Sequence, residues 1–378
     1  MNPISGFSTL GRTLAIIAVS VAALLVSSSA MAVDYAGKRI MITVPFPEGG
    51  GTDSYSRFMA PYFEKYLPGN PKIIIVNRPG GGGLTGVNYF AAKAEKDGTW
   101  ILALSTSSMS NYMLGDKRAN FKMENFVPII LSPRGIMQYV RKDFGVQNIP
   151  DLKAKIDKLR SFPKSKLVFG GKTPTSGGLA LRTGLSLLGV EVNSVMGLTG
   201  NGPMALAFER GEFTLNYDNT LSFLNNRAHL IKNGTAVPLY TFGVINEDGT
   251  IGRDPATPDV PTLDEFYKAV HGKAPSGDAY NAWRSLMAVS VPLSKSWNLM
   301  AGTPPDVVKV WREAAQKAYA DVMKDPKGQK IFGPYKNIMS DAAIKIRDDG
   351  TTLKPESAKW LTKYVKDRFK MDIHPKTK

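Results

Sequence analysis

The feature that most constrains the fold is an alternation of short apolar runs with helical stretches along most of the chain. Such an alternation predicts an α/β architecture. The runs that we interpret as strands are rich in β-branched and large apolar residues, and they are Ile40–Val44, Ile73–Val76, Trp100–Leu104, Leu167–Phe169, Val192–Met196, Phe213–Tyr217 and Leu239–Val244.

Three helices are predicted with defined ends. The first begins near Asp53, where aromatic residues recur at helical spacing, and Pro61 inside it predicts a kink or a late start. The second covers Asp306–Met323, with Thr303 as its cap and Pro304 in its first turn. The third covers Ser357–Phe369. The turn-rich segment 246–261 is expected to be a long surface loop.

Five strand ends pass through a glycine- or hydroxyl-bearing loop into a predicted helix. They read PFPEGGGTD (45–53), STSSMSN (105–111), GGKTPTSGG (170–178), GLTGNGP (197–203) and DNT (218–220). The first turn of a helix has unpaired N–H groups and partial positive charge, so such a junction binds a carboxylate or phosphate without a charged side chain. In open α/β sheets these junctions lie together at the carboxyl edge of the strands. The sequence therefore predicts one shared ligand cleft.

The first 32 residues are typical of a secretory signal peptide. Leu14–Val26 is apolar or small apart from Ser20, and SSSAMA places Ala30 and Ala32 at the spacing that a signal peptidase accepts. The run of about 13 residues is short beside the roughly 20 of a membrane-spanning helix, which is the alternative interpretation. We predict cleavage after Ala32 and export, to the periplasm in a cell with two membranes.

Composition excludes several classes of function. The chain has no cysteine, which excludes disulfides, thiol catalysis and cysteine-based metal sites. Its formal net charge is +16, but the basic residues are scattered among acids or recur at helical spacing. That pattern indicates a solvated basic face, and we expect no nucleic-acid partner.

No catalytic motif is complete. GGGLTG (81–86) has the G-x-G-x-x-G spacing but follows a second strand, where a dinucleotide fold does not use it. The three histidines, His229, His271 and His374, are isolated from one another and are expected at the surface. We therefore expect no enzyme activity, no metal and no cofactor.

Several segments together resemble a known family. They are ITVPFPEGGGTDSYSR, VNRPGGGGLTGVNYFAAKAEKDGTWILALSTS, NFVPIILS, GEFTLNYDN, PDVPTLDEF and AGTPPDVVKVWREAAQKAYADVMKDP. In this order they resemble the periplasmic solute receptors of tripartite tricarboxylate transporters, also called Bug proteins. The resemblance runs from about Arg39 to about Pro326.

The resemblance implies a two-domain type II periplasmic binding protein, or Venus flytrap, with an interdomain ligand cleft. Domain I would comprise 33–133 and 241–378, and domain II would comprise 134–240. The implied ligand is a small organic acid, which a monomeric receptor would deliver to integral-membrane permease subunits. The alternatives are a ligand-sensing receptor for a two-component kinase and an exported enzyme that uses Glu48 and Asp218 as acid or base.

The resemblance also assigns the ligand-contacting loops. One domain would offer Phe46–Asp53 and Ser105–Ser108, and the other would offer Thr173–Ser176, Gly200–Pro203 and Asp218–Asn219. The predicted ligand-binding residues are Phe46, Glu48, Gly49, Gly50, Thr52, Asp53, Ser105, Thr106, Ser107, Ser108, Thr173, Thr175, Ser176, Thr199, Gly200, Asn201, Gly202, Asp218 and Asn219.

Two departures from the family pattern affect the expected ligand. Leu198 and Thr199 stand where the family commonly has tyrosine and lysine, and Glu48 stands where it usually has a small or neutral residue. Both changes predict a less positive cleft and disfavour dicarboxylates and tricarboxylates. Glu48 is expected either to face the cleft, where it would repel a second carboxylate or receive a ligand amine or hydroxyl, or to face solvent.

Overall fold

The computed structural model describes residues 33–246 and 248–378, so the predicted signal peptide lies outside the described residues. Tyr35–Lys378 form one compact unit that contains two five-stranded sheets. Within the described ranges, no helix combines the length and apolar character that crossing a membrane requires. The α/β class predicted from the sequence is confirmed.

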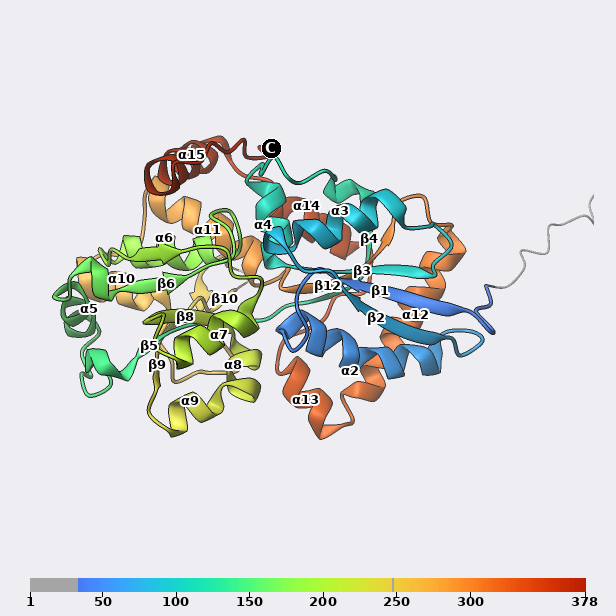
Figure 1. The fold of residues 1–378 in the computed structure, drawn as a ribbon, viewed down its shortest axis with the longest axis horizontal. Coiled ribbons are helices and arrows are strands. Elements are labelled where there is room, and N and C mark those ends of the chain that lie inside the picture. The colour runs from blue at the N-terminus through green and yellow to red at the C-terminus, as the bar shows by residue number, and fades with distance from the viewer. Residues whose placement is uncertain (1–32, 247) are drawn as a thin grey trace, which may run out of the picture. The chain divides into compact units, whose positions relative to one another are not determined.

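The first sheet has the strand order β2-β1-β3-β12-β4. Strand β1 pairs in parallel with β2 and β3, while β12 lies antiparallel between β3 and β4. The strands are β1 (Arg39–Val44), β2 (Lys72–Asn77), β3 (Trp100–Ser105), β4 (Phe126–Ser132) and β12 (Lys295–Met300). Figure 1 shows α2 (Gly51–Tyr66) and α3 (Leu84–Lys93) on opposite sides of these strands.

The second sheet repeats this pattern with the order β7-β6-β8-β5-β9. Its first three strands are parallel, and β5 lies antiparallel between β8 and β9. The strands are β5 (Ile136–Arg141), β6 (Val168–Gly170), β7 (Asn193–Val195), β8 (Leu215–Asn219) and β9 (Ala236–Thr241).

The remaining elements connect and cover the two sheets. The helices are α4 (Thr106–Met113), α5 (Leu152–Arg160), α6 (Gly178–Leu187), α7 (Asn201–Glu209), α8 (Thr220–Asn226), α9 (Ala228–Lys232), α10 (Leu263–His271), α11 (Asp278–Ser290), α12 (Pro305–Val322), α13 (Pro326–Phe332), α14 (Ala342–Gly350) and α15 (Pro355–Phe369). Short 3-10 turns cover Gly81–Gly83, Met123–Asn125, Lys142–Phe144 and Lys164–Lys166, and a small hairpin pairs β10 (Val244–Ile245) with β11 (Ile251–Gly252).

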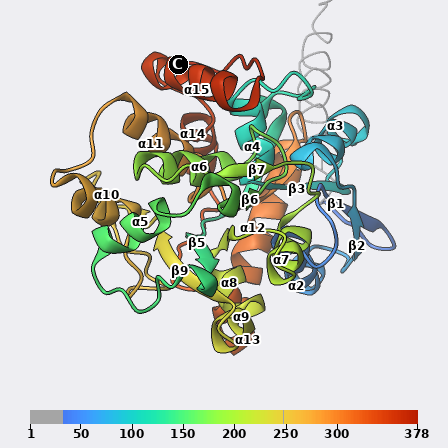
Figure 2. The same cartoon turned by 60° about the vertical axis from the view of Figure 1, so that its left-hand side comes forward.

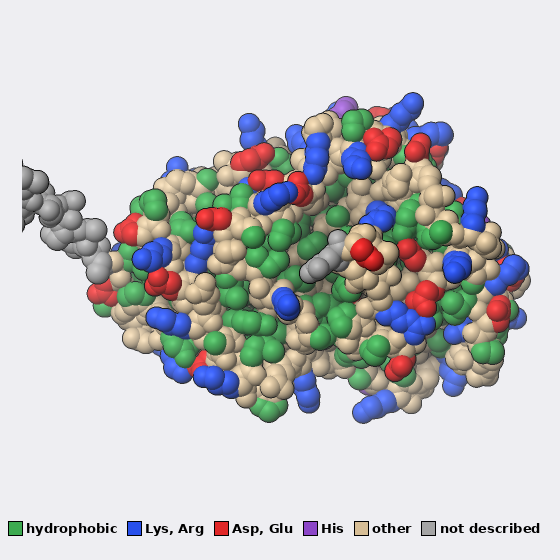
Figure 3. Space-filling view, turned by 180° about the vertical axis from the view of Figure 1, so that it is seen from behind, with side chains coloured by type: hydrophobic (Ala, Val, Ile, Leu, Met, Phe, Trp, Pro, Cys, Tyr) green, Lys and Arg blue, Asp and Glu red, His purple; other side chains and the backbone are tan. Residues whose placement is uncertain are grey.

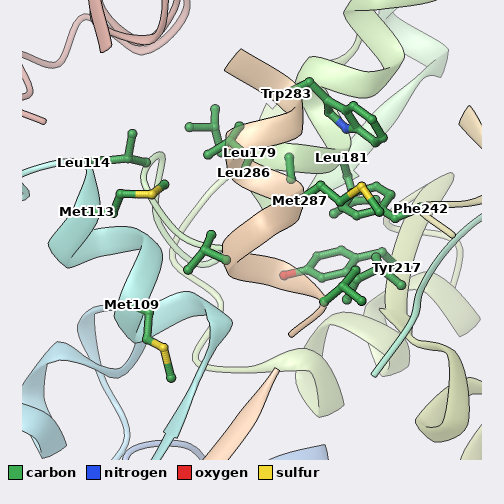
Figure 4. Close-up of a cluster of buried hydrophobic side chains, with 14 of the residues drawn as sticks. Met109, Met113, Leu114, Leu179, Leu181, Tyr217, Phe242, Trp283, Leu286 and Met287 are labelled. Atoms are coloured by element: carbon green, nitrogen blue, oxygen red, sulfur yellow. The ribbon is translucent and has the colours of Figure 1, made fainter. Parts of the chain in front are cut away.

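One hydrophobic core extends from the helices of the first sheet to those of the second. Helix α11 contacts both α4 and α6, and its Trp283 and Met287 are fully buried. In Figure 4, Trp283 and Met287 lie beside Leu181 of α6, while Met113 of α4 lies on the other side of α11. Because burying an apolar side chain contributes roughly 1.5–3 kcal/mol, this cluster joins the two sheets firmly at that end.

The chain end is part of the same packing. Helix α15 contacts α11, and Figures 1 and 2 both show the two helices side by side. Beyond α15, the Lys376 N–H donates to the Met113 carbonyl over 2.8 Å, and Leu353 bridges to Thr377. The terminal segment therefore contacts elements that lie far from it in the sequence.

Several details differ from the sequence-based prediction. Helix α2 begins at Gly51 and continues through Pro61 to Tyr66. The cap predicted at Thr303 is wrong, because its hydroxyl donates to the Met300 carbonyl over 2.8 Å and α12 has no side-chain cap. The segment 246–261 is not wholly a loop, because it contains β11.

Strands β4, β5 and β12 were not predicted. Strand β12 carries polar residues such as Lys295 and Asn298, yet all six of its residues are buried, because it is an inner strand of a sheet with helices on both sides. The division into 33–133 with 241–378 and 134–240 stays a prediction. Helix α10 contacts α5, and α11 contacts α6 as well as α4 and α15.

Candidate functional site

All five predicted junctions are strand-to-helix connections, and they line one cavity. The pairs are β1–α2, β3–α4, β6–α6, β7–α7 and β8–α8. The cavity has an empty volume of about 670 Å³, including open solvent at its mouth. Its lining residues are Phe46, Pro47, Gly50, Gly51, Thr52, Ser105, Thr106, Ser107, Ile136, Lys172, Gly177, Leu181, Gly200, Asn201, Gly202, Pro203, Tyr217, Asp218, Asn219, Ser290, Ser294 and Lys295.

Helix starts dominate this lining. The first residues of α2, α4 and α7 are part of it, and so is Gly177, which precedes α6. Each start has unpaired N–H groups and the positive end of a helix dipole. Both sheets contribute such starts, so an anion in the cavity would contact backbone donors from both.

Two buried lysines were missed by sequence reasoning. Lys172, in the β6–α6 loop, donates from Nζ to Asn201 Oδ1 over 2.6 Å and to the Tyr217 hydroxyl over 3.0 Å. Lys295, at the start of β12, donates to the Ser294 carbonyl over 3.1 Å. Both line the cavity, which therefore carries basic side chains although Leu198 and Thr199 stand where the family commonly has tyrosine and lysine. The available signal for Lys172 was a lone cation inside a Gly/Thr-rich junction.

The charge environment of Lys295 is unusual. Burial is the largest of the effects that lower the pKa of Lys295 to about 7; the nearby cations Arg134 and Lys172 act in the same direction, and Asp218 opposes them. The lysine therefore changes charge close to neutral pH in the ligand-free protein. A bound anion would favour its charged form.

Arg134 extends the basic character into an adjoining hollow, which shares Gly51, Asn219 and Lys295 with the main cavity. The guanidinium carbon of Arg134 lies 5.7 Å from the ring centroid of Tyr55 and 5.0 Å from that of Phe332. Its Nη2 atom has no hydrogen-bond partner in the described part of the chain. Burial lowers the pKa of Arg134 to about 10, so the side chain remains charged at neutral pH.

Asp218 is the acidic group that lines the cavity. Its carboxylate accepts hydrogen bonds from Asn201 Nδ2 over 3.2 Å and from the Tyr139 hydroxyl over 3.1 Å. Arg227 Nε lies 3.7 Å from the same carboxylate. Burial raises the pKa of Asp218, while these partners and Lys172 favour its ionised form. The arrangement orients Asn201 and Lys172 toward the cavity.

Asp53 stabilises the β1–α2 loop but does not itself line the cavity. Its carboxylate accepts from the Gly49 N–H and from Asn77 Nδ2, each over 2.9 Å, and it pairs with Arg57 Nε over 3.0 Å. Gly49 has a φ of +70°, which favours glycine at that turn. Glu48 lies 3.6 Å from Arg57 and its side chain is 79% exposed. The structure thus places Glu48, Gly49 and Asp53 outside the cavity lining.

The threonines of the β6–α6 loop also lie outside the lining. Thr173 and Thr175 direct their hydroxyls to Asn111 Oδ1 over 3.0 and 2.8 Å, and Thr175 Oγ1 lies 2.9 Å from Asp116 Oδ2. The Ser176 hydroxyl donates to the Thr173 carbonyl. These contacts join a loop of the second sheet to α4 of the first.

Ser108 and Thr199 complete the residues placed away from the cavity. Ser108 is buried against the Gly81–Gly83 turn, where a Cβ on Gly83 would lie 2.4 Å from Ser108 Oγ and 2.8 Å from Phe46 Cζ. The glycines therefore allow close packing on α4. Thr199 is exposed.

The other predicted site residues are brought together in the lining. They are Phe46, Gly50, Thr52, Ser105, Thr106, Ser107, Gly200, Asn201, Gly202, Asp218 and Asn219. His229, His271 and His374 are exposed, as predicted. Figure 3 shows basic and acidic side chains interspersed with apolar ones over one face, in keeping with the predicted solvated basic surface.

Comparison with solved structures identifies the fold. The periplasmic binding protein BugD matches with a TM-score of 0.64 over 86% of this chain and 97% of its own, at 20% identity. The chain has the fold of a periplasmic binding protein. MatC from Rhodopseudomonas palustris with bound malate has a TM-score of 0.59 at 19% identity, covering 87% of this chain and 98% of its own. The R. palustris protein Rpa4515 with adipate has a TM-score of 0.62 at 21% identity, covering 88% and 98%.

Two relatives match part of the sequence of this chain. Protein BugT of Bordetella pertussis is 37% identical over 97 residues, which are 26% of this chain and 28% of BugT. A UPF0065 protein from the tcbD–tcbE intergenic region of Pseudomonas sp. strain P51 is 27% identical over 126 residues, which are 33% of this chain and 37% of that protein. The matches therefore span about a third of these relatives' lengths. No family model matches the chain. The predicted resemblance to Bug proteins is confirmed by these names.

Proposed function

We propose that the protein is a non-catalytic solute receptor that captures a small organic acid in the cavity between its two sheets. The observation that carries this proposal is the convergence of helix starts and two buried lysines, Lys172 and Lys295, on one cavity. Backbone N–H groups at a helix start bind one carboxylate without a charged partner. Lys172 and Lys295 supply the charge for a second carboxylate.

A dicarboxylate is therefore the ligand class that we propose. Similar folds have been solved with malate and with adipate, both dicarboxylates, and this supports the assignment. A dianion would also relieve the repulsion among the cations Lys172, Lys295 and Arg134. In the ligand-free cavity, Asp218 is the acidic group near these cations. Because the Asp218 carboxylate is engaged by Asn201 and Tyr139, we assign it an orienting role and not a proton transfer.

Calorimetry with a panel of acids tests this proposal. Malate, adipate and citrate would be compared with acetate, with an aromatic acid and with an amino acid at constant ionic strength. We expect dicarboxylates to bind at least tenfold more tightly than acetate, and Lys172→Met or Lys295→Met to remove that preference. Lys232→Met, a charge loss at an exposed position of α9, is the matched control. Failure of all these acids to bind at millimolar concentration would refute the proposal.

We further propose that the receptor acts as a periplasmic monomer that delivers its ligand to membrane permease subunits. The periplasmic binding protein fold and the Bug relatives support this placement. The N-terminal sequence of protein recovered from a periplasmic fraction should begin at Val33, and light scattering should give the mass of one mature chain. Uptake of labelled ligand into proteoliposomes should require both the receptor and the permease. Uptake without the receptor would contradict the delivery role.

A further inference from the structure

A second polar pocket lies beneath the C-terminal helix. Helix α6 contributes Arg182 and Ser186, and α15 contributes Tyr364, Arg368 and Phe369. The remaining lining comes from Lys164 and the segment 190–194, which leads into β7. Among the described residues, this lining shares no member with that of the ligand cavity. The pocket is therefore a separate place on the molecule.

Arg182 is a buried cation, and no acidic side chain in the described part of the chain forms an ion pair with it. It is 2% exposed, and its Nε, Nη1 and Nη2 atoms have no hydrogen-bond partner among residues 33–246 and 248–378. The guanidinium carbon lies 5.3 Å from the ring centroid of Phe169 and 5.3 Å from that of Phe369. Two aromatic rings attract a cation but accept no conventional hydrogen bond from its N–H groups. Burying such a charge is strongly unfavourable unless a partner supplies both charge and acceptors.

The neighbouring groups leave the pocket positive. Arg368 pairs with both carboxylate oxygens of Glu191, the distance from Nη2 to Oε1 being 2.6 Å. This pair neutralises the acidic group of the lining, and Arg182 and Lys164 remain. Burial lowers the pKa of Arg182 to about 10, so the guanidinium stays charged at neutral pH.

The pocket also adjoins the edge of a sheet. Strand β7 is the outer strand of the order β7-β6-β8-β5-β9, and Asn193 and Ser194 line the pocket. An edge strand leaves alternate backbone N–H groups unused by a neighbouring strand, and because the Asn193 N–H donates to the Leu167 carbonyl over 2.9 Å, the outward-facing position here is Ser194. Such donors suit an anion more than a cation.

We propose that this pocket is a second anion-binding site, distinct from the ligand cavity, which takes a small oxyanion on Arg182. A planar guanidinium binds phosphate or carboxylate oxygens through paired N–H donors. Lys164 and the β7 edge supply further donors. Because Tyr364 and Phe369 close the pocket from α15, a bound oxyanion would strengthen the attachment of the C-terminal helix to α6. This gives α15 a role in anion binding.

The test uses inorganic phosphate as the probe and the intact mature chain. Thermal unfolding is followed while phosphate replaces chloride at constant ionic strength, and radiolabelled phosphate is measured by equilibrium dialysis. We expect a saturable rise in the melting temperature. Arg182→Met should weaken phosphate binding at least tenfold, without lowering the melting temperature in phosphate-free buffer, because it removes the unpaired charge.

Controls separate this site from the ligand cavity. Phosphate binding should persist in Lys172→Met/Lys295→Met, and malate binding by Arg182→Met should equal that of the unaltered protein. Lys232→Met should retain the full phosphate response. Loss of phosphate binding in the double cavity variant, or an unchanged response in Arg182→Met, would overturn the proposal.

A measurement on the unaltered protein covers the case in which Arg182→Met does not fold. Phosphate should slow backbone hydrogen exchange in α15 more than in α9, because α15 closes the pocket. Equal exchange in α15 with phosphate and with chloride would argue against the site. A lowered affinity in Lys164→Met would support it.

Discussion

Thr175 Oγ1 lies 2.8 Å from Asn111 Oδ1 and 2.9 Å from Asp116 Oδ2. One hydroxyl of the β6–α6 loop therefore contacts a side chain of α4 and a side chain that follows α4 in the sequence. Asn111 in turn donates from Nδ2 toward the Gly81 and Gly82 carbonyls over 3.3 Å. All of these side chains are buried. The cluster therefore links a loop of the second sheet to a helix and a glycine turn of the first.

Breaking this link should cost stability and affinity together. Asn111→Ala leaves the hydroxyls of Thr173 and Thr175 without their shared acceptor, so we expect a loss of about 1–3 kcal/mol in the free energy of unfolding. Ligand affinity should also fall, although Asn111 does not line the cavity. Urea-induced unfolding and calorimetry provide the two measurements. In a double-mutant cycle with Thr175→Val, the coupling should be about 0.5–2 kcal/mol, and strict additivity would contradict the link.

Substitutions of Asp53 and of Glu48 should change the free energy of unfolding by very different amounts, although both acids belong to the same loop. Asp53→Ala removes the acceptor of the Gly49 N–H and of Asn77, so we expect about 1–3 kcal/mol of destabilisation. Glu48→Ala removes an exposed ion pair with Arg57 and should change stability by less than about 0.5 kcal/mol. Thermal unfolding compares the two variants. A larger effect from Glu48→Ala would mean that Glu48 has a role that its exposed position does not indicate.

Substitutions at Gly200 and Gly202 can be compared to test how closely the loops of the two sheets approach each other. A Cβ on Gly200 would lie 2.9 Å from Pro47 Cδ, whereas a Cβ on Gly202 would have no described atom within 4 Å outside its own neighbourhood. Gly200→Ala should therefore push the loops apart and weaken ligand binding severalfold. Gly202→Ala should weaken binding less, because its methyl would meet no described atom within 4 Å, although Gly202 also lines the cavity. Calorimetry with malate measures both, and an equal loss of affinity in the two variants would contradict this close approach.

Binding of a dicarboxylate should weaken as pH rises. The ligand-free pKa of Lys295 is about 7, and a bound anion raises it, so binding takes up a proton above pH 7. Affinity should fall by up to about tenfold per pH unit until the pH reaches the bound-state pKa. Isothermal calorimetry between pH 6 and 9 in buffers of different ionisation enthalpy would detect the proton. Lys295→Arg should show a flat profile, and a flat profile in the unaltered protein would exclude this linkage.

Lys295 should also make the stability of the ligand-free protein depend on pH, and here the trend is an increase with pH. The pKa of Lys295 falls from 10.5 when unfolded to about 7 when folded. Between these values the unfolded chain binds the additional proton, so the contribution of Lys295 to stability rises with pH from about 7 to 10.5. Lys295→Met should lack this contribution. The measurement is the pH dependence of urea-induced unfolding, compared between the two proteins.

Local sequence patterns determined much of this protein. Apolar runs predicted the three parallel strands of each sheet, and glycine- and hydroxyl-bearing segments predicted all five junctions. A short segment is enough to predict these features, because glycine, serine and threonine at a strand end affect the backbone of residues close to them in the sequence. The rule that junctions meet at one sheet edge accounts for Phe46 with Ser105 at the first sheet and for Asn201 with Asp218 at the second, whereas the meeting of the two edges at one cavity is a property of the tertiary structure.

Only the tertiary structure decided which side chains face the cavity and which stabilise the loops around it through hydrogen bonds. Thr173, Thr175 and Asp53 look like ligand contacts in the sequence, yet their partners are Asn111, Gly49 and Asn77. Lys295 enters the cavity because β12 inserts between β3 and β4, a pairing with residues almost two hundred positions away. Long-range pairing and burial set these orientations and the pKa of Lys295, and neither is a property of a short segment.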